Sequence, residues 1–328
     1  MTTNGHRLHE EERMRERGPG LGWTALVCGL ALAVAVGCGN GPAPIVSDDG
    51  GVVTPGTDDE ALFQEGLTFY DARQFAEAQA RFDALLAAFP LSRRHDNAGY
   101  LAGRCRYELG DFVGAITVLL EMRAVHPTSL LIGSAAYFTG RSRYNLLDFV
   151  GAVPDFQASL AADPAGVFAD NAAYYVGRSY YEAADFLAAQ TELARFEGAY
   201  PTSTYLDNAR YYLGRAHFDA ADWAGAIAPF ERVFTTPGSP YEDDARYYLG
   251  RARYAQADLA GALADFDTLL AAYPTSQCID NALGYEARVY ADMGDCATAR
   301  AKFSLLQSMF PASPAIAPVD AYLVTLAC

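Results

Sequence analysis

The stretch Tyr200–Arg215 reads YPTSTYLDNARYYLGR and decides the fold, because variants of it return along the chain at a nearly constant distance. Its glycine, Gly214, marks a small residue that recurs every 36 or 37 residues. The seven anchor positions are Gly66, Gly103, Gly140, Gly177, Gly214, Gly250 and Ala287. A period in this range is typical of stacked helical units that bury a continuous core between neighbours.

Other residue types keep the same spacing. An alanine stands twelve residues after every anchor, a Phe or Leu sixteen after, and an aspartate eight after in six of the seven repeats. The alanines are Ala78, Ala115, Ala152, Ala189, Ala226, Ala262 and Ala299. The aspartates are Asp111, Asp148, Asp185, Asp222, Asp258 and Asp295. A proline closes each unit, at Pro90, Pro127, Pro164, Pro201, Pro237, Pro274 and Pro311.

Each repeated residue has a structural role, and together these roles predict two helices per unit. The aspartate side chain caps free N–H groups, so we expect it to begin the second helix, helix B. Proline ends helix B because it lacks an N–H donor. A serine two residues after the proline, such as Ser203, is expected to cap the next first helix, helix A. The unit is then helix A of about 16 residues, a tight turn, helix B of about 14 residues and a loop.

This order of small, aromatic, Ala, Phe and Pro positions resembles the tetratricopeptide repeat family, whose usual unit is shorter by about three residues. The resemblance covers residues 60–311 and implies an all-α, right-handed α-solenoid of seven helical hairpins. The YPTS…DNA…YYLGR phrasing is similar to a periplasmic subgroup. That subgroup includes the assembly lipoprotein of the outer-membrane β-barrel machine and the cell-division coordinator linked to the Tol–Pal system. Because the last repeat of a solenoid exposes one face, residues 312–328 are expected to form a capping helix.

The N-terminal part of the chain reads as a targeting segment. Arginines at 13, 15 and 17 precede an apolar run that closes with Ala35-Val36-Gly37-Cys38. Small residues just before this cysteine resemble the lipobox of bacterial lipoproteins, which implies a signal peptide at residues 1–37 and a diacylated Cys38. The alternative is a single transmembrane anchor, because the apolar run is only slightly shorter than the roughly 20 residues needed to span a bilayer.

The residues on either side of this N-terminal targeting segment add predictions about the tether, the location and the start of translation. Residues 38–59 are rich in Gly, Pro and Asp and are expected to form a flexible tether. The lipoprotein resemblance and Gly39 after the cysteine imply the periplasmic side of the outer membrane. Because the acidic run Glu10–Glu12 is unusual ahead of a signal peptide, translation is expected to begin at Met14.

Helix A lines the inner, concave wall in the tetratricopeptide family, so the resemblance points to the residues three before and one after each anchor. These candidates are Tyr100, Arg104, Tyr137, Arg141, Tyr174, Arg178, Tyr211, Arg215, Tyr247, Arg251 and Arg288. Tyr and Arg often carry most of the energy of an interface, and Arg can grip a carboxylate with two parallel bonds. We therefore expect a groove that binds an extended segment of a partner protein.

A structural interpretation of the same residues stays open. Four arginines precede an acid by four residues, as Arg104–Glu108, Arg178–Glu182, Arg215–Asp219 and Arg288–Asp292. Such pairs on a helix surface stabilise it by only a few tenths of a kcal/mol each, about 0.2–0.5. Tyrosines at these positions can also be ordinary packing between helices.

Composition narrows the class of function. The net charge of −16 argues against a nucleic-acid partner. The sequence shows no Ser–His–acid order, no phosphate-binding glycine loop, no paired-carboxylate motif and no His/Cys cluster, so we expect no enzyme activity, cofactor or metal. We predict a lipid-anchored periplasmic adaptor for outer-membrane assembly or envelope maintenance. The alternatives are an oligomer-forming envelope scaffold without a peptide groove, and a glycan-binding module suggested by the repeated tyrosines.

The cysteines of the repeats allow one disulfide prediction. Cys278 and Cys296 begin two antiparallel helices, so they are separated by roughly 24 Å for 16 helical residues, well beyond the limit of about 7 Å for a bridge. The capping helix runs in the direction of helix A, so its end at Cys328 should return to the level of Cys296. We predict a Cys296–Cys328 disulfide; the alternative is free, buried thiols.

Overall fold

The computed structural model describes residues 45–46, 52–53, 58–236 and 238–328. The signal peptide predicted at 1–37, Cys38, most of the tether predicted at 38–59 and Pro237 lie outside the described residues. Inside that tether, strands β1 (Ile45–Val46) and β2 (Val52–Val53) form a short antiparallel pair.

Fifteen α-helices follow one another in the described part of the chain. They are α3 (Asp58–Asp71), α4 (Phe75–Ala88), α5 (His95–Glu108), α6 (Phe112–Val125), α7 (Ile132–Asn145), α8 (Phe149–Ala162), α9 (Ala169–Glu182), α10 (Phe186–Ala199), α11 (Leu206–Asp219), α12 (Trp223–Val233), α13 (Glu242–Ala255), α14 (Leu259–Ala272), α15 (Ile279–Asp292), α16 (Cys296–Met309) and α17 (Ile316–Thr325). None of these described helices is long and apolar enough to cross a bilayer.

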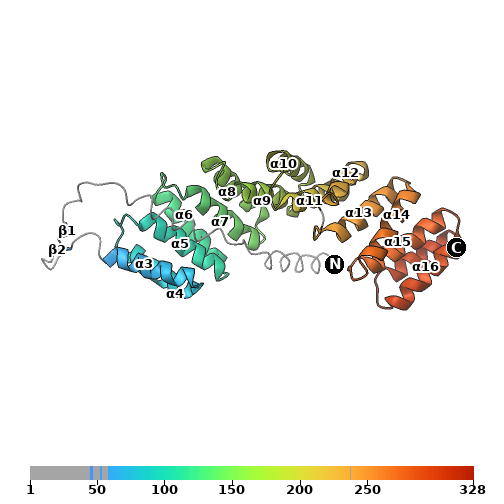
Figure 1. Cartoon of the computed structure of the whole chain (residues 1–328), viewed down its shortest axis with the longest axis horizontal. Helices are drawn as coiled ribbons and strands as arrows, with labels where there is room; N and C mark the ends of the chain where they lie inside the picture. Colours follow the sequence, from blue (N-terminus) through green and yellow to red (C-terminus); the bar gives the residue numbers. More distant parts are fainter. Residues whose placement is uncertain (1–44, 47–51, 54–57, 237) are drawn as a thin grey trace. The chain divides into compact units, whose positions relative to one another are not determined.

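The chain divides into two compact units. Unit 1 ends at Leu109 and contains α3, α4 and α5, whereas unit 2 begins at Gly110 and contains α6 to α17. Within unit 2 the helices α7 to α16 form hairpins that follow one another in chain order (Figure 1). The prediction of an all-α solenoid of helical hairpins is confirmed, although most helices have 14 residues and helix A is two residues shorter than expected.

The anchor glycines allow the two helices of a hairpin to approach closely. A Cβ atom added to Gly214 would lie 2.6 Å from the ring of Phe230, which stands sixteen residues later. The same conflict arises between Gly140 and Phe156 at 2.9 Å. The alanine twelve residues after the anchor is fully buried in every repeat, as Ala226 illustrates. The repeated glycines are therefore required because a Phe or Leu side chain of helix B lies directly against the backbone of helix A, and this agrees with the close helix approach that the sequence predicts.

The aspartates cap helix B as predicted. In each case the side chain accepts a hydrogen bond from the N–H three residues on, as Asp148 does from Gly151. The first hairpin has Gln74 at this place and no side-chain cap.

The prediction that a serine caps helix A is wrong in detail. Helix A begins three residues after the serine, and Ser203 Oγ instead accepts from the N–H of Tyr205 in the preceding turn. The same hydroxyl donates to Asp170 of the preceding helix A at 2.7 Å. The serine therefore joins one repeat to the next, because its hydroxyl can donate and accept at once.

The turn between helices A and B has a left-handed residue. Leu147 has a φ of 63°, its N–H donates to the carbonyl of Tyr144, and the next N–H, of Asp148, donates to the carbonyl of Arg143. This pair of bonds satisfies the last carbonyls of the helix and reverses the chain in a few residues. Only the equivalent positions Gly110 and Gly294 are occupied by glycine among the described turns of this type.

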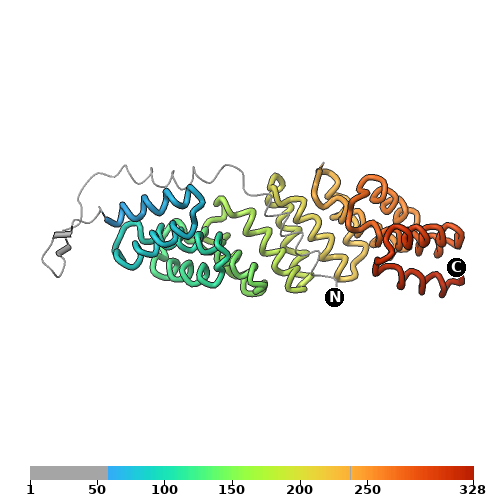
Figure 2. Tube along the Cα trace, turned by 90° about the horizontal axis from the view of Figure 1, so that it is seen from below, coloured from blue at the N-terminus to red at the C-terminus, as the bar shows by residue number. Residues whose placement is uncertain are grey.

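The C-terminal helix covers the last hairpin. Helix α17 packs on both α15 and α16, and its tube lies beside theirs at the red end of Figure 2. Val319 and Leu323 are buried in this contact. The helix begins at Ile316, four residues after the start of the segment predicted to form it. A disulfide joins Cys296 at the start of α16 to Cys328, with 4.9 Å between the two Cα atoms.

Candidate functional site

The first helices of the hairpins in unit 2 carry the repeated tyrosines and arginines on one side. Helices α9, α11, α13 and α15 also contact one another in turn. We call this surface the A-helix wall, and we define it by the residues two and three before, and one and four after, each anchor on helices α7, α9, α11, α13 and α15. The candidates predicted from the sequence are distributed over this wall, with Tyr100 and Arg104 at the matching positions of α5 in unit 1.

The tyrosines three before the anchor are core residues. Tyr174 is fully buried, and its ring stacks on Tyr205 with 4.8 Å between ring centroids. Tyr211 stacks in the same way on Tyr241 at 4.8 Å. Tyr100, Tyr137 and Tyr247 are also buried. The structure therefore corrects the expectation that these side chains offer surface to a partner: they lie between hairpins and stabilise the stack.

The stacking partners are a position that the sequence prediction missed. Phe168, Tyr205 and Tyr241 each stand nine residues before an anchor, just ahead of helix A. Tyr241 also accepts a hydrogen bond from Asn208 Nδ2 at 2.9 Å. The sequence does contain a pattern that could have predicted these residues, because they keep the same 36- or 37-residue spacing as the anchors.

In unit 2, the arginine one after each anchor contacts an aromatic ring of the next hairpin or of the capping helix. The guanidinium carbon of Arg178 lies 3.5 Å from the centroid of the Tyr212 ring. Arg141 lies 4.3 Å from the Tyr175 ring in the same relation. A guanidinium over an aromatic face is attracted by the ring quadrupole, and more strongly where water is excluded. The tyrosines two before the anchor were not predicted as site residues, yet they receive the arginines.

Three of the four predicted acid pairs are present. Arg104 donates to Glu108 at 2.7 Å, and Arg178 donates to Glu182 at 2.6 Å. Arg215 reaches Asp219 at 3.2 Å. Their arginines are buried or half-buried, with Arg178 only 4% exposed, so the description as weak surface pairs does not hold for Arg178.

The fourth predicted pair is not formed. Asp292 instead accepts hydroxyl groups from Tyr254 at 2.6 Å and from Tyr322 of the capping helix at 2.5 Å. In the described part of the chain, Arg288 has no carboxylate within ion-pair distance, and it lies against the rings of Tyr285 and Tyr322.

The A-helix wall becomes more accessible toward the C-terminus. In the middle of unit 2, Tyr175 and Tyr212 are buried. Their equivalents in the later repeats, Tyr248 and Tyr285, are only partly buried, as is Arg251 between them. Arg141 and Arg215 are partly exposed as well, so what changes toward the C-terminus is the exposure of the tyrosine two before the anchor, on α13 and α15.

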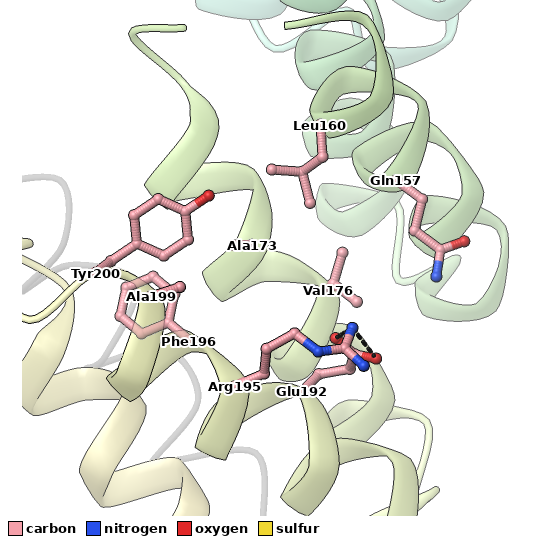
Figure 3. A pocket seen from close by; sticks show the side chains of 9 residues that line it. All are labelled: Gln157, Leu160, Ala173, Val176, Glu192, Arg195, Phe196, Ala199 and Tyr200. Carbon is pink, nitrogen blue, oxygen red and sulfur yellow. Dashed lines mark hydrogen bonds and ion pairs between the residues drawn. The ribbon is translucent and has the colours of Figure 1, made fainter. Parts of the chain in front are cut away.

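A shallow pocket of about 170 Å³ lies elsewhere, between α8, α9 and α10 (Figure 3). Its floor includes Val176 and Phe196, and it contains none of the predicted site residues. The two charged residues in it, Glu192 and Arg195, pair with each other at 2.8 Å. The charged groups of the pocket are therefore already paired with each other, and the pocket contains no reactive group.

The described residues hold no group of three or more His, Cys, Asp or Glu that could bind a metal ion. Two buried acids have unusual pKa values. Burial raises the pKa of Asp265 to about 6, against the opposing effect of Arg253 at 2.5 Å, and burial raises the pKa of Glu286 to about 7 beside Lys302. Both acids pair with a cation of a neighbouring helix, which is a structural arrangement.

Comparison with known proteins agrees with this architecture. Two tetratricopeptide repeat family models match residues 63–129 and 177–240, and residues 244–276. No curated protein matches the sequence. The C-terminal part of a TPR repeat-containing protein from Cytophaga hutchinsonii is similar with a TM-score of 0.63 and 18% identity, over 78% of this chain and 98% of that one.

Two further solved structures share the fold. PilF of Pseudomonas aeruginosa has a TM-score of 0.51 and 16% identity, over 69% of this chain and 96% of that one. PilW, described as a widely conserved type IV pilus biogenesis factor, has a TM-score of 0.50 and 17% identity, over 69% of this chain and 98% of that one. From its repeats, its hairpins and these matches, the chain belongs to the tetratricopeptide repeat proteins.

Proposed function

We propose that this chain is a membrane-anchored scaffold that holds an extended segment of a partner protein along the A-helix wall. The observation that carries the proposal is the alternation of partly exposed aromatic and guanidinium side chains on α13 and α15. Tyr248, Arg251 and Tyr254 come from α13, and Tyr285 and Arg288 come from α15. Tyr and Arg supply large contact area and directional donors, and they dominate measured interface energies.

The wall is held rigid before any partner arrives. Arginine–tyrosine contacts join neighbouring hairpins, and Tyr181 donates to Asp219 of the next helix A at 2.7 Å. A surface that is already ordered loses less conformational entropy when it binds. This supports a role in binding rather than in catalysis, since tetratricopeptide scaffolds are typically not enzymes.

The location belongs to the same proposal. A lipidated Cys38 at the end of an apolar run would attach the repeats to a membrane through two acyl chains, which suffice for stable anchoring. The resemblance to the periplasmic subgroup supports a proposed location on the periplasmic side of the outer membrane and a proposed role in assembly or maintenance of the envelope. The likeness to PilW supports the fold alone and does not choose among envelope processes.

Site-specific crosslinking in the producing cells tests the proposal. A photo-reactive phenylalanine analogue at position 285 of the full-length chain should yield one discrete adduct with another protein. The matched control carries the analogue at Tyr200, beside the shallow pocket and away from the wall, and should yield none. If position 285 gives no adduct, or if both positions give the same adducts, the proposal is refuted.

A second candidate, an oligomer-forming scaffold, is favoured by one observation. Val113, Val150 and Leu187 are the second residues of the B helices α6, α8 and α10, and all three are strongly exposed. Leu146 and Leu147 in the adjoining turn are exposed as well, whereas later repeats have alanine at the matching helix starts. If this edge joins two copies, the full-length chain should form a concentration-dependent oligomer in sedimentation, and Leu187→Asp should abolish it.

A further inference from the structure

A row of exposed aliphatic side chains follows one edge of unit 2, and we call it the apolar edge. It consists of Val113, Val150 and Leu187 on α6, α8 and α10, with Leu146 and Leu147 in the turn between α7 and α8. The first three side chains are 64%, 74% and 75% exposed, and the two turn leucines are 45% and 55% exposed. Exposed aliphatic side chains that gather in one place mark contact sites more often than single ones do.

The fold itself does not require large side chains on this edge. Helices α6, α8 and α10 are the second helices of consecutive hairpins, so their starts lie at the same end of each hairpin. Every other repeat has alanine at the position of Val113, Val150 and Leu187, namely Ala76, Ala224, Ala260 and Ala297. These repeats form the same hairpin with the smaller residue, so the aliphatic side chains serve something other than packing within the chain.

Leu147 is exposed and also lies in an unfavourable backbone conformation. Its φ is 63°, in the left-handed region where a Cβ atom is disfavoured. The other left-handed residues in the described part of the chain are Gly, Ala or Arg. A large aliphatic side chain at this place gains no burial within the chain, and backbone outliers of this kind cluster at functional sites.

We propose that the apolar edge lies against the surface of a bilayer with zwitterionic headgroups and inserts its side chains among the upper parts of the acyl chains. This inference rests on the membrane attachment in the proposed function and adds the edge that meets the membrane. A tether of some 20 residues between Cys38 and Asp58 has an r.m.s. span of roughly 25 Å. Attachment through Cys38 would therefore keep the chain near the bilayer, where a contact of a few side chains is populated at high local concentration.

The size of the edge favours lipid over a second copy of the chain. A stable interface buries about 800 Å² on each protein partner and needs close shape complementarity. Five side chains in a row, none of them aromatic, offer less than this area. A fluid lipid surface needs no matching shape, because the acyl chains rearrange around the inserted side chains.

The charges beside the edge favour the same partner. An exposed aspartate stands two residues before each of the three helix residues, at Asp111, Asp148 and Asp185. A contact between two copies would bring these like charges together, which weakens association. A zwitterionic headgroup instead carries an ammonium group that can lie close to a carboxylate and attract it.

Quenching of tryptophan fluorescence by lipid tests the proposal. The chain has two tryptophans, Trp23 and Trp223, and both are changed to Phe so that a single new tryptophan reports. The full-length chain with Leu187→Trp is mixed with phosphatidylcholine vesicles whose acyl chains are either brominated or ordinary. Bromine quenches tryptophan at close contact, so this chain should lose fluorescence only in the brominated vesicles.

The control reporter is Leu130→Trp. Leu130 is 83% exposed and lies in the loop before α7, at the opposite end of that helix from Leu146. The 14 residues of α7 separate the two places by about 20 Å. Leu130→Trp should therefore keep its fluorescence in brominated vesicles.

A further change connects the quenching to the whole row. In the Leu187→Trp chain, Val150→Asp places a charge in the proposed contact and should reduce the loss of fluorescence. Ala260→Asp adds the same charge at the matching exposed position of α14 and should leave the quenching unchanged. Circular dichroism of each variant verifies that the helices are intact.

Three results would overturn the inference: no quenching at position 187, equal quenching at positions 187 and 130, or unchanged quenching in the Val150→Asp chain. If position 187 is not quenched and Leu187→Asp abolishes an oligomer in sedimentation, the edge belongs to a second copy. The mass of the N-terminal peptide reports acylation of Cys38 separately. An acylated chain without quenching at position 187 keeps the membrane attachment and loses only the edge contact. Quenching at position 187 alone in a chain that is not acylated keeps the edge contact and refutes the lipid anchor.

Discussion

Arg178 donates to Glu182 at 2.6 Å while its guanidinium carbon lies 3.5 Å from the centre of the Tyr212 ring. One buried side chain thus completes an ion pair on its own helix and a cation–π contact with the next hairpin. Removing it leaves the partly buried Glu182 without its partner, and breaking a pair of this kind typically costs several kcal/mol.

Arg178→Gln should therefore lower the free energy of unfolding by about 2–4 kcal/mol in urea titration. Arg195→Gln is the matched control, because Arg195 also pairs with a glutamate on its own helix but is 69% exposed. That change should cost less than about 1 kcal/mol. Equal effects of the two changes would show that burial of the pair does not decide its contribution.

Gly214→Ala should destabilise the chain, because the new Cβ would lie 2.6 Å from the ring of Phe230. The two helices must then separate, at a cost of about 1–3 kcal/mol. Gly198→Ala in α10 is the control, since an added Cβ there has no neighbour within 4 Å. The control should be neutral or stabilise by up to about 1 kcal/mol through helix propensity. Thermal unfolding followed by circular dichroism distinguishes the two outcomes.

Gln74→Asp should stabilise the first hairpin. Gln74 precedes α4 with φ of −87° and ψ of 70°, close to the −80° and 72° of Asp111, which caps α6. The backbone is therefore already in the conformation that an aspartate cap requires, and the gain should be about 0.5–1.5 kcal/mol. Hydrogen exchange of the first-turn amides of α4 measures it; unchanged protection contradicts the prediction. Gln74→Asn, which can cap without a charge, separates the hydrogen bond from the helix dipole.

Glu286 makes stability depend on pH in an unusual direction. It is fully buried, and burial raises the pKa of its carboxyl from 4.5 to about 7, although Lys302 Nζ lies 2.9 Å away. The folded state then holds this proton more tightly than the unfolded chain does. The group's contribution to stability is complete below pH 4.5 and is lost as the pH rises to about 7.

Glu286→Leu should therefore stabilise the chain at pH 8 by about 1–3 kcal/mol, and the difference from wild type should shrink toward pH 5. Leucine occupies the matching position in the preceding repeat, at Leu249, so the side chain fits the site. Lys302 stays partly exposed near Asp267 and is not left as an isolated buried charge. Urea titrations at the two pH values test this, and a variant that is less stable at pH 8 would contradict it.

The disulfide between Cys296 and Cys328 should stabilise the capping helix against unfolding. It closes a loop with a sequence separation of 32, for which the chain-entropy model gives roughly 3–4 kcal/mol. Peptide mapping without reductant should recover the two cysteines joined, and reduction should lower the melting temperature. Cys105 serves as the internal control, since burial raises the pKa of its thiol to about 12 and it should be alkylated only after unfolding. A free Cys328, or Cys328 joined to Cys278, would refute the pairing.

The last hairpin shows why a cysteine pair can replace aromatic packing. In the first, third, fourth and fifth repeats an aromatic residue four after the anchor contacts another nine after it, as Phe218 contacts Trp223 at 4.9 Å. In the last repeat these positions are Ala291 and Cys296. The disulfide between Cys296 and Cys328 therefore occupies the position that the aromatic residue nine after the anchor occupies in those repeats.

The sequence by itself determined the helical hairpins, their number and the residues that join each pair. Gly214, Ala226 and Asp222 act within one hairpin, where the geometry of two antiparallel helices is nearly invariant, so spacing alone predicts their contacts. The cap of Asp222 on the N–H of Gly225 is a contact over three residues, which no other part of the chain can alter.

Only the tertiary structure decided how the repeats meet, and therefore which side chains are available. Arg178 and Arg251 occupy the same place in their repeats, yet Arg178 is buried with a carboxylate and Arg251 is partly exposed among rings without one. Likewise, Asp292 does not pair with Arg288. It accepts hydrogen bonds from the hydroxyl groups of Tyr254 and Tyr322, which lie on other helices. Burial and pairing between repeats depend on the rotation of one hairpin against the next and on neighbours far away in the sequence. A periodic sequence pattern gives the order of the residue types but not the angle between neighbouring hairpins, so it does not predict that rotation.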